Sequence, residues 1–371
     1  MKILHTADWH LGKKIEGRSM LENQRAALRE IKEICDETRP DAVIIAGDVF
    51  DTAVPPSDAE ELFFEACASL ASPGRAVIAL AGNHDDEVRL CAARSLAEKH
   101  NIYLVGDLDN GFFDSATVKG GEGWLKIKTA SGLLNLALLP YPLESVIGGG
   151  GEDFCVRVQS AAARCAQCFS ADGVNVFVSH IFMMDGSEEK LLGGARILPS
   201  SVLPAGADYI ALGHIHKAVK AAKNMPAYYS GSITPCNFAE TEQKSVNLVS
   251  FGKSVEINVI PLKSIKKLVR IEASDYCAAY EKLAACSDYA EILYDSTEPL
   301  TPKNLAELRA LPAFVKFTPC AARVTGERAA RRIMTDEELF TAFYKHNRNG
   351  ETPSDKDVEL FLKALKGESL I

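Results

Sequence analysis

The stretch AVIIAGDVFD at residues 42–51 joins a short apolar run to a polar motif, and this pairing decides the fold. Similar apolar runs lie on both sides of it: KILHTA at 2–7, AVIALA at 76–81 and IYLV at 102–105. Helix-like segments separate the runs, over about 21–38, 58–71 and 88–99. Strands that alternate with helices indicate parallel strands joined by crossover helices. The sequence therefore predicts an α/β fold.

The pattern becomes strand-rich after residue 112. Residues 113–141 have the character of antiparallel strands, and a helix is expected near 153–170. Five further apolar runs follow: VNVFVSH, ADYIALGH, AYYSGS, SVNLVSF and SVEINVI. Two packed sheets flanked by helices would accommodate both halves, so we expect one two-sheet sandwich domain over residues 1–262.

A second, smaller unit is predicted at residues 264–320. LVRIEA, a helix at 275–286, AEILYD, a helix at 302–310 and FVKFTP give the order β-α-β-α-β of a small α+β domain. Basic residues are frequent between 316 and 332, which indicates a linker or a basic contact strip; we assign 321–333 as a basic linker. Two short helices, a helix-loop-helix, are expected at 334–371.

Composition excludes intrinsic disorder, collagen-like repeats and coiled coil for the bulk of the chain. The 371 residues include 47% hydrophobic and 25% charged residues, an ordinary globular balance. The net charge of −9 gives no global attraction to nucleic acid, so DNA binding would need local basic patches or metal ions. The start MKILHTADWH has no apolar core behind a basic head, and no run of about 18 apolar residues exists. We therefore expect no membrane association and a cytoplasmic location, with the ten cysteines, including the pair Cys165 and Cys168, as free buried thiols.

Five short motifs follow apolar runs, where strand ends bring loops together. They are Asp8-Trp9-His10, Gly47-Asp48-Val49-Phe50-Asp51, Gly82-Asn83-His84-Asp85, Ser179-His180 and Gly213-His214-Ile215-His216. Five of the eight histidines fall within them. A single one of these histidines would more readily be a core or capped imidazole, but the five motifs together favour a metal site.

The residue types suit two divalent ions that share a bridging anion. Asp48 could bridge with both carboxylate oxygens. Asp8 and His10 lie two apart, as do His214 and His216, so on extended segments each pair would project to one side. Asn83 offers an amide oxygen and His180 fills the remaining position. This mixture suits Mn²⁺, Fe²⁺ or Zn²⁺. His84 is left over and could donate a proton to a leaving oxygen.

This order of motifs resembles the calcineurin-like metallophosphoesterase superfamily. In that superfamily the position of Asp51 orients the histidine of the GNH motif, which implies an Asp51–His84 pair; an N-cap of the following helix is the alternative for Asp51. Phosphoprotein phosphatases place an Arg after this Asp to grip a phosphate dianion, whereas Thr52 and Ala53 follow here. The site therefore favours a phosphodiester substrate.

Within the superfamily, TADWHLG, AGDVFD, GNHD, ALGHIH with YYSGS, and FAETEQKSV resemble the SbcD family of nuclease subunits, over about residues 1–262. The resemblance implies a manganese-dependent DNA exonuclease and endonuclease (3′–5′ on double strands, endonucleolytic on single strands) in DNA repair, recombination and replication. It implies an SbcC-type ATPase partner, a homodimer within a heterotetramer, and a small domain that caps the site. One metal would take Asp8, His10, Asp48 and His216; the other would take Asp48, Asn83, His180 and His214.

Two enzyme functions and one non-enzymatic function remain open. A phosphodiesterase for cyclic nucleotides or other small diesters would not need the extra domain and tail, and an inactive scaffold subunit would not need every ligand position.

For DNA, lysines after the last motif and at the start of the small unit could follow the phosphate backbone, although a solvated charged face explains the second cluster equally well. These lysines are Lys217, Lys220, Lys266 and Lys267.

The predicted tail helices carry apolar stripes. A capping box at Thr335 and Glu338 would open the first helix, and Ser354 would cap the second. The stripes could pack back onto the catalytic domain, or could dock on the SbcC coiled coil, as the resemblance implies. The residues expected to make that contact are Leu339, Phe340, Phe343, Phe361 and Leu365.

Overall fold

A computed structural model describes most of the chain. The described residues are 1–109, 113–148, 153–183, 190–192, 195–296 and 298–320, together with 340, 341, 344, 352–354, 357, 358 and 361. The contacts divide the chain into two units, Met1–Cys320 and Ala321–Ile371.

The first sheet has six strands in the order β19-β18-β1-β4-β5-β6. Its parallel strands are β1 (Lys2–Thr6), β4 (Ala42–Ala46), β5 (Ala76–Leu80) and β6 (Ile102–Val105). Two antiparallel strands, β18 (Ser245–Phe251) and β19 (Val255–Pro261), complete the edge beside β1. The predicted parallel strands are thus confirmed, and β18 and β19 bring the end of the larger body back beside its beginning.

The second sheet has eight strands in the order β16-β17-β15-β11-β10-β9-β8-β7. The hairpins predicted at 113–141 are β7 (Phe113–Asp114), β8 (Val118–Gly121), β9 (Trp124–Thr129) and β10 (Gly132–Leu139). Next to β10 come β11 (Gly173–His180), β15 (Tyr209–Gly213) and β17 (Ala227–Tyr229), all parallel, and then β16 (Val219–Lys220). Strand β10 is antiparallel to β9 but parallel to β11, so the sheet changes from antiparallel to parallel pairing at β10. The carboxyl ends of β11 and β15 lie near those of the parallel strands of the first sheet.

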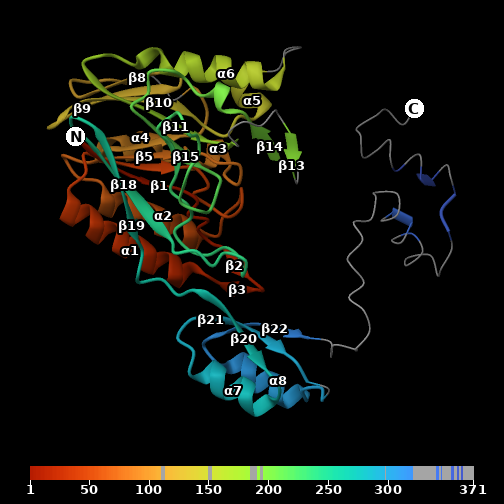
Figure 1. Cartoon of the computed structure of the whole chain (residues 1–371). Coiled ribbons are helices and arrows are strands. Elements are labelled where there is room, and N and C mark those ends of the chain that lie inside the picture. The colour runs from red at the N-terminus through yellow and green to blue at the C-terminus, as the bar shows by residue number, and fades with distance from the viewer. Residues whose placement is uncertain are drawn as a thin grey trace. The chain divides into compact units, whose positions relative to one another are not determined.

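Four layers are stacked in the order helices, sheet, sheet, helix (Figure 1). Fully buried side chains such as Ile44, Leu136 and Val178 fill the space between the sheets. Helices α1 (Leu21–Thr38) and α2 (Ser57–Leu70) cover the first sheet, and α6 (Phe154–Cys165) covers the second. All five residues of β4 are buried because both of its faces are covered, which explains its continuous apolar run. The predicted two-sheet sandwich with flanking helices is confirmed at this level.

The sequence predicts one helix over 88–99, and this prediction is wrong because the helix is not continuous. The chain there forms α3 (Glu87–Leu90), α4 (Arg94–Ala97) and a 3₁₀ turn at Glu98–His100. Only Leu90 and Ala97 of this segment are buried. Two buried side chains are too few to hold a continuous helix against the cost of ordering it.

Several small elements lie outside the main sheets. They are α5 (Glu144–Ile147), the 3₁₀ turns Ala166–Cys168 and Ser200–Val202, the hairpin β2 (Lys14–Ile15) with β3 (Arg18–Ser19), and a sheet of β12 (Phe182–Met183), β14 (Ala195–Leu198) and β13 (Lys190–Leu192).

The small unit has the predicted order. It consists of β20 (Leu268–Ala273), α7 (Tyr276–Ala284), β21 (Tyr289–Tyr294), α8 (Pro302–Ala310) and β22 (Phe314–Pro319), and its three strands are parallel. It contacts the larger body through a small core that includes Met20, Phe238 and Leu268. Asn23 also makes two hydrogen bonds with the main chain of Lys266. These contacts explain why residues 1–320 form one compact unit.

Part of the predicted tail can be described. The Phe340 and Phe361 rings stack with centroids 4.3 Å apart, so two members of the apolar stripes contact each other. Ser354 caps its helix as predicted, since its hydroxyl accepts the Asp357 N–H. The basic linker, the capping box of Thr335 and Glu338, and Leu339, Phe343 and Leu365 lie outside the described residues.

Two further expectations concern membranes and cysteines. Among the described residues, no helix is long and apolar enough to span a membrane. All ten cysteines are free, including the adjacent Cys165 and Cys168, which are buried. The expectation that all of them are buried is wrong, because Cys277 is exposed and four others are half-buried.

Candidate metal centre

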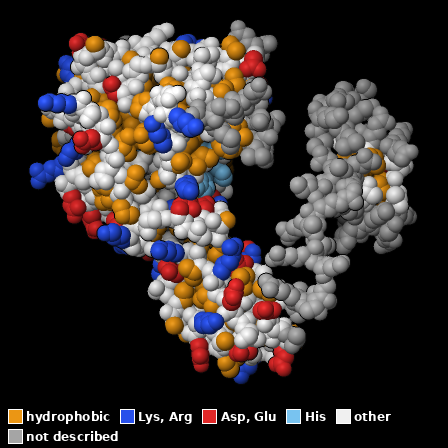
Figure 2. Space-filling view, viewed as in Figure 1, with side chains coloured by type: hydrophobic (Ala, Val, Ile, Leu, Met, Phe, Trp, Pro, Cys, Tyr) orange, Lys and Arg blue, Asp and Glu red, His pale blue; other side chains and the backbone are white. Residues whose placement is uncertain are grey.

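Hydrogen bonds between loops bring the five motifs together at one edge of the two sheets. The Asp8 N–H donates to the Gly47 carbonyl at 3.0 Å, and the His10 N–H donates to the Asp48 carbonyl at 3.0 Å. The His214 N–H, at the end of the second sheet, donates to the Asp8 carboxylate at 3.0 Å. The histidines reach the surface in a hollow above the small unit (Figure 2).

The first predicted group of donors is His10, His216, Asp48 and Asp8. The Nε2 atoms of His10 and His216 face each other at 3.0 Å, and His10 Nε2 lies 3.6 Å from Asp48 Oδ2. Asp8 lies with Asp48 and His180 in a buried cluster whose candidate ligand atoms are all within 4.8 Å of one another.

The second group shares Asp48 with the first. His180 Nε2 lies 3.3 Å from Asp48 Oδ2 and 3.1 Å from Asn83 Oδ1. His214 Nδ1 lies 2.9 Å from the same Asn83 oxygen. Ligands bound at about 2.0–2.2 Å to one ion lie about 3 Å from each other. The donor set therefore fits two divalent ions with Asp48 between them.

The ligand pairs converge for a different reason from the one expected. Asp8, His10 and Asp48 have positive φ values of 52°, 46° and 49°, and His214 has φ 105°. None of these four residues lies in a strand, so the extended geometry assumed for Asp8–His10 and His214–His216 is wrong. Left-handed backbone at non-glycine residues costs about 1–3 kcal/mol each and persists only when the surroundings impose it. Here the bonds between loops impose it.

Neighbouring groups fix which ring nitrogen of two histidines is available. His180 Nδ1–H donates to the Ala46 carbonyl at 2.9 Å, and His216 Nδ1 contacts Glu240 Oε1 at 2.9 Å. Both contacts engage Nδ1 and turn Nε2 toward the centre, an orientation typical of metal-binding histidines. The sequence suggested no role for Glu240, although it lies in the FAETEQKSV segment. Its carboxylate also contacts the Lys244 ammonium and accepts the Cys236 N–H.

The buried carboxylates and histidines of the site shift one another's pKa values. Burial raises the pKa of Asp48, but the charge of His180, a hydrogen bond to it and other neighbours outweigh burial and hold that pKa below its usual range. Burial lowers the pKa of His180, yet Asp48 raises it to about 9; burial and the charge of His180 lower the pKa of His214 to about 3. His214 is thus a neutral donor, whereas His180 must lose a proton before it can bind an ion.

Asp85 is a second residue to which the sequence gave no role. It ends the GNHD motif, is buried, and its carboxylate accepts the N–H groups of Val49, Phe50 and Gly82 at 3.0, 2.8 and 2.8 Å. These bonds tie the loop that carries Asn83 to the loop that carries Asp48. Only the folded chain reveals this, because the donors are main-chain groups.

Asp51 and His84 pair as expected, but assigning the contact to the Asp51 carboxylate is wrong. His84 Nδ1–H donates to the main-chain carbonyl of Asp51 at 2.8 Å, while the Asp51 carboxylate contacts Lys13 Nζ at 2.9 Å and lies 3.5 Å from His10 Nδ1. The Asp51 N–H donates to the Leu11 carbonyl, and this bond sets the backbone direction. The N-cap alternative is also wrong, because the next helix begins at Ser57. The bond to the Asp51 carbonyl engages Nδ1 of His84, so Nε2 is the ring nitrogen available to the centre.

The lysines expected to contact DNA are all exposed. Lys220 donates to the Lys223 carbonyl and lies over the Tyr228 ring, and Lys266 lies over the Tyr289 ring. Lys267 lines a cavity of about 300 Å³ that Glu240 and Lys244 also line. Their exposure is compatible with phosphate binding and equally with a solvated face, so their role stays a prediction.

Replacing Glu240 with Gln tests its support of His216. The amide is uncharged, so we expect the affinity for the first ion to fall about 10–100-fold, the usual cost of losing such a partner. Glu242→Gln is the matched control, because Glu242 contacts Lys244 at 2.9 Å and is not a partner of His216. Titration of Mn²⁺ into both metal-free variants measures the effect. Equal affinities would show that Glu240 does not support the site.

The buried Asp and His cluster at the edge of a two-sheet sandwich defines a metallophosphoesterase, and the family model of calcineurin-like phosphoesterases matches residues 1–218. The chain is also 32% identical to the SbcD subunit of the nuclease SbcCD from Bacillus subtilis (strain 168), over 99% of this chain and 98% of the relative. The chain therefore belongs to the SbcD family of nuclease subunits.

Proposed function

We propose that this chain hydrolyses DNA phosphodiester bonds with two Mn²⁺ ions, as a 3′–5′ exonuclease on double strands and an endonuclease on single strands, in DNA repair, recombination and replication. One observation carries the proposal: the Asp48 carboxylate is near both donor groups, 3.6 Å from His10 and 3.3 Å from His180. That is the arrangement a two-ion phosphoesterase requires.

The two ions would be held as the sequence predicts, the first by Asp8, His10, Asp48 and His216 and the second by Asp48, Asn83, His180 and His214. Oxygen and imidazole donors in this mixture suit Mn²⁺. When bound, the ions supply Lewis-acid activation of the phosphodiester and of water.

His84 is the residue we assign to proton transfer. Its Nδ1–H is engaged by the Asp51 carbonyl, and its main-chain N–H donates to Asp48 Oδ1 at 2.9 Å. These two bonds hold the ring at the edge of the centre, 4.9 Å from the His10 ring between centroids. Nε2 is then positioned to protonate the leaving oxygen.

Digestion of end-labelled duplex and single-stranded DNA with Mn²⁺, with a cyclic nucleotide assayed in parallel, tests the proposal. Cleavage of DNA alone supports it. Cleavage of the cyclic nucleotide alone would favour a small-diester enzyme, and no cleavage by protein with both ions bound would favour a scaffold.

We further propose a separate function for each domain, as the sequence suggests. Residues 1–262 form the nuclease domain, 264–320 a capping and DNA-binding domain, 321–333 a linker, and 334–371 a docking segment for an SbcC-type ATPase. The named relative is one subunit of a complex called SbcCD, which supports such a partner. A homodimer within a heterotetramer and a cytoplasmic location complete the proposal.

Deletion of residues 333–371 tests the docking segment. We expect Mn²⁺-dependent cleavage of short DNA to persist and binding of the ATPase partner to be lost, because Phe340 and Phe361 would be removed together. Pull-down and nuclease assays on the truncated chain measure both. Unchanged capture of the partner would contradict the docking site, and loss of the fold would show that the tail packs on the catalytic domain.

A further inference from the structure

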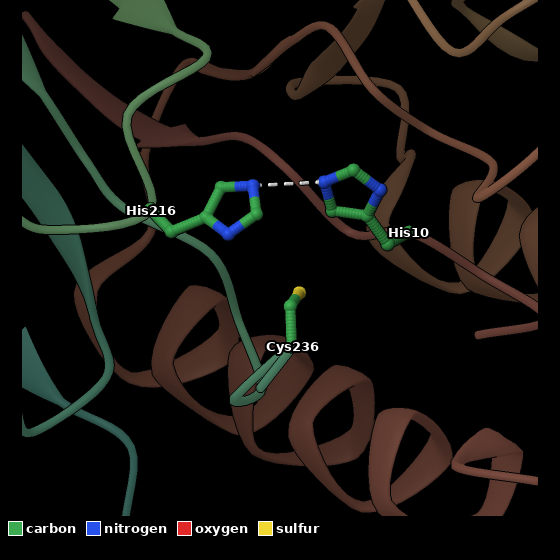
Figure 3. A group of neighbouring side chains, drawn as sticks. All are labelled: His10, His216 and Cys236. Atoms are coloured by element: carbon green, nitrogen blue, oxygen red, sulfur yellow. Dashed lines mark hydrogen bonds between the residues drawn. The ribbon is translucent and has the colours of Figure 1, made fainter. Parts of the chain in front are cut away.

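A thiol lies beside the first donor group. Cys236 Sγ, with ligand atoms of His10 and His216, forms a cluster in which every pair of atoms lies within 4.8 Å. Figure 3 shows the sulfur directed toward the gap between the two imidazoles. Cys236 is 8% exposed, and the metal assignment above does not use it.

The loop holds this thiol in place through the group that supports His216. The Cys236 N–H donates to Glu240 Oε2 at 3.1 Å, while Glu240 Oε1 contacts His216 Nδ1 at 2.9 Å. One carboxylate thus fixes both the backbone of the cysteine and the ring of the histidine. The positions of Cys236 and His216 in the cluster are therefore fixed by hydrogen bonds to the same carboxylate.

The two imidazoles themselves point to a cation. His216 Nδ1 faces Glu240, which holds a proton on Nδ1 and turns Nε2 toward His10. His10 Nδ1 is buried without a hydrogen-bond partner but lies 3.5 Å from Asp51 Oδ1, which favours its proton there as well. The two Nε2 atoms face each other across 3.0 Å, so a positive charge between them, a proton or a metal ion, binds both rings.

The cysteine changes which ion this pair prefers. Two imidazoles and a thiolate are a donor set typical of Zn²⁺ and softer ions, whereas carboxylate and amide oxygens suit Mn²⁺. We propose that His10, His216 and Cys236 form an alternative binding site for a thiophilic divalent cation such as Zn²⁺ or Cd²⁺. On binding, the sulfur forms a bond to the ion and its proton passes to the solvent, with no change of oxidation state.

This site and the first Mn²⁺ position share His10 and His216, so the two cannot be filled together. Zn²⁺ bound through Cys236 therefore inhibits the enzyme in competition with Mn²⁺. The competitive consequence rests on the nuclease function proposed above, while the three-residue site does not.

Titration of Cd²⁺ into chelator-treated full-length protein tests the site without any activity assay. Sulfur bound to Cd²⁺ gives a ligand-to-metal charge-transfer absorption in the ultraviolet. In Cys236→Ser we expect the tightest component of this absorption to vanish, and Zn²⁺ affinity to fall at least about 100-fold, since even indirect partners cost about 10–100-fold. Cys277→Ser is the matched control, because Cys277 is exposed and should contribute only a weaker component. Mn²⁺ affinity should stay equal in all three proteins.

An unchanged tight component in Cys236→Ser would overturn the proposal, as would a Zn²⁺ affinity equal to that of the unsubstituted protein. Should that variant unfold, ¹¹³Cd resonance of the unsubstituted protein decides the matter, because a sulfur ligand shifts the signal far from that of nitrogen and oxygen ligands. A Cd²⁺ band that depends on Cys236 in a protein that cleaves no DNA would retain this site and reject the nuclease function. Zn²⁺ inhibition of DNA cleavage that is weaker in Cys236→Ser would support both the cation site and the nuclease function.

Discussion

Asp48→Ala is expected to remove both metal ions together and to lower DNA cleavage by about 10³-fold or more. Asp48 lies between the two donor groups, so each group loses the same carboxylate. The rate loss follows from several kcal/mol of lost transition-state stabilisation. Calorimetric titration of Mn²⁺ gives the number of ions bound. One ion still bound tightly would contradict the bridging role.

The backbone at Asp48 requires a second variant. Its φ of 49° is costly for Ala, whereas Asn tolerates this conformation. Asp48→Asn therefore removes the charge without adding backbone strain, and its single carbonyl oxygen is expected to support one ion at most. Asp41→Asn, just before the start of the same strand, is the control for general loss of stability, because Asp41 accepts the Lys2 N–H far from the centre.

His84→Ala is expected to retain metal binding but to slow turnover by about 10²–10⁴-fold, the usual contribution of a positioned acid or base. The main-chain N–H that His84 donates to Asp48 is unaffected by the change. His100→Ala, which alters an exposed histidine, is the control. Mn²⁺ titration and DNA cleavage are measured on both variants.

A substrate with a better leaving group separates proton donation from other roles of His84. A nitrophenyl phosphodiester needs little protonation of its leaving oxygen, so the defect of His84→Ala should shrink with it. An equally large defect would argue against proton donation. Loss of metal would instead make His84 a ligand. This outcome is measured as well, because His84 forms a candidate metal-binding cluster with His10 and Asp48.

The convergence of the candidate ligands was predictable from the sequence because each motif lies at the end of a buried strand or just after it. Strand positions come from local apolar patterning, and strand ends of an α/β sheet meet at one edge. Asp48 and His180 could therefore be assigned to one site although they belong to different sheets and lie far apart in the chain. The order of elements in the small unit was predictable for the same local reason.

The supporting residues could not be predicted. Asp85 binds three main-chain N–H groups, and main-chain groups have no signature in the sequence. Glu240 reaches His216 from a loop 24 positions further along, and nothing local marks that contact. The Asp51–His84 contact runs through a carbonyl, so side-chain chemistry alone suggested the wrong atoms.

The sequence by itself determined the class of the fold, the identity of the candidate ligands and the order of the small unit, because these depend on patterns within short segments. The tertiary structure decided how the ligands converge, which nitrogen each histidine presents and where Cys236 lies. Asp8, His10, Asp48 and His214 adopt left-handed backbone that no local preference favours. Hydrogen bonds between loops that are distant in the chain impose it, and only folding brings those loops together.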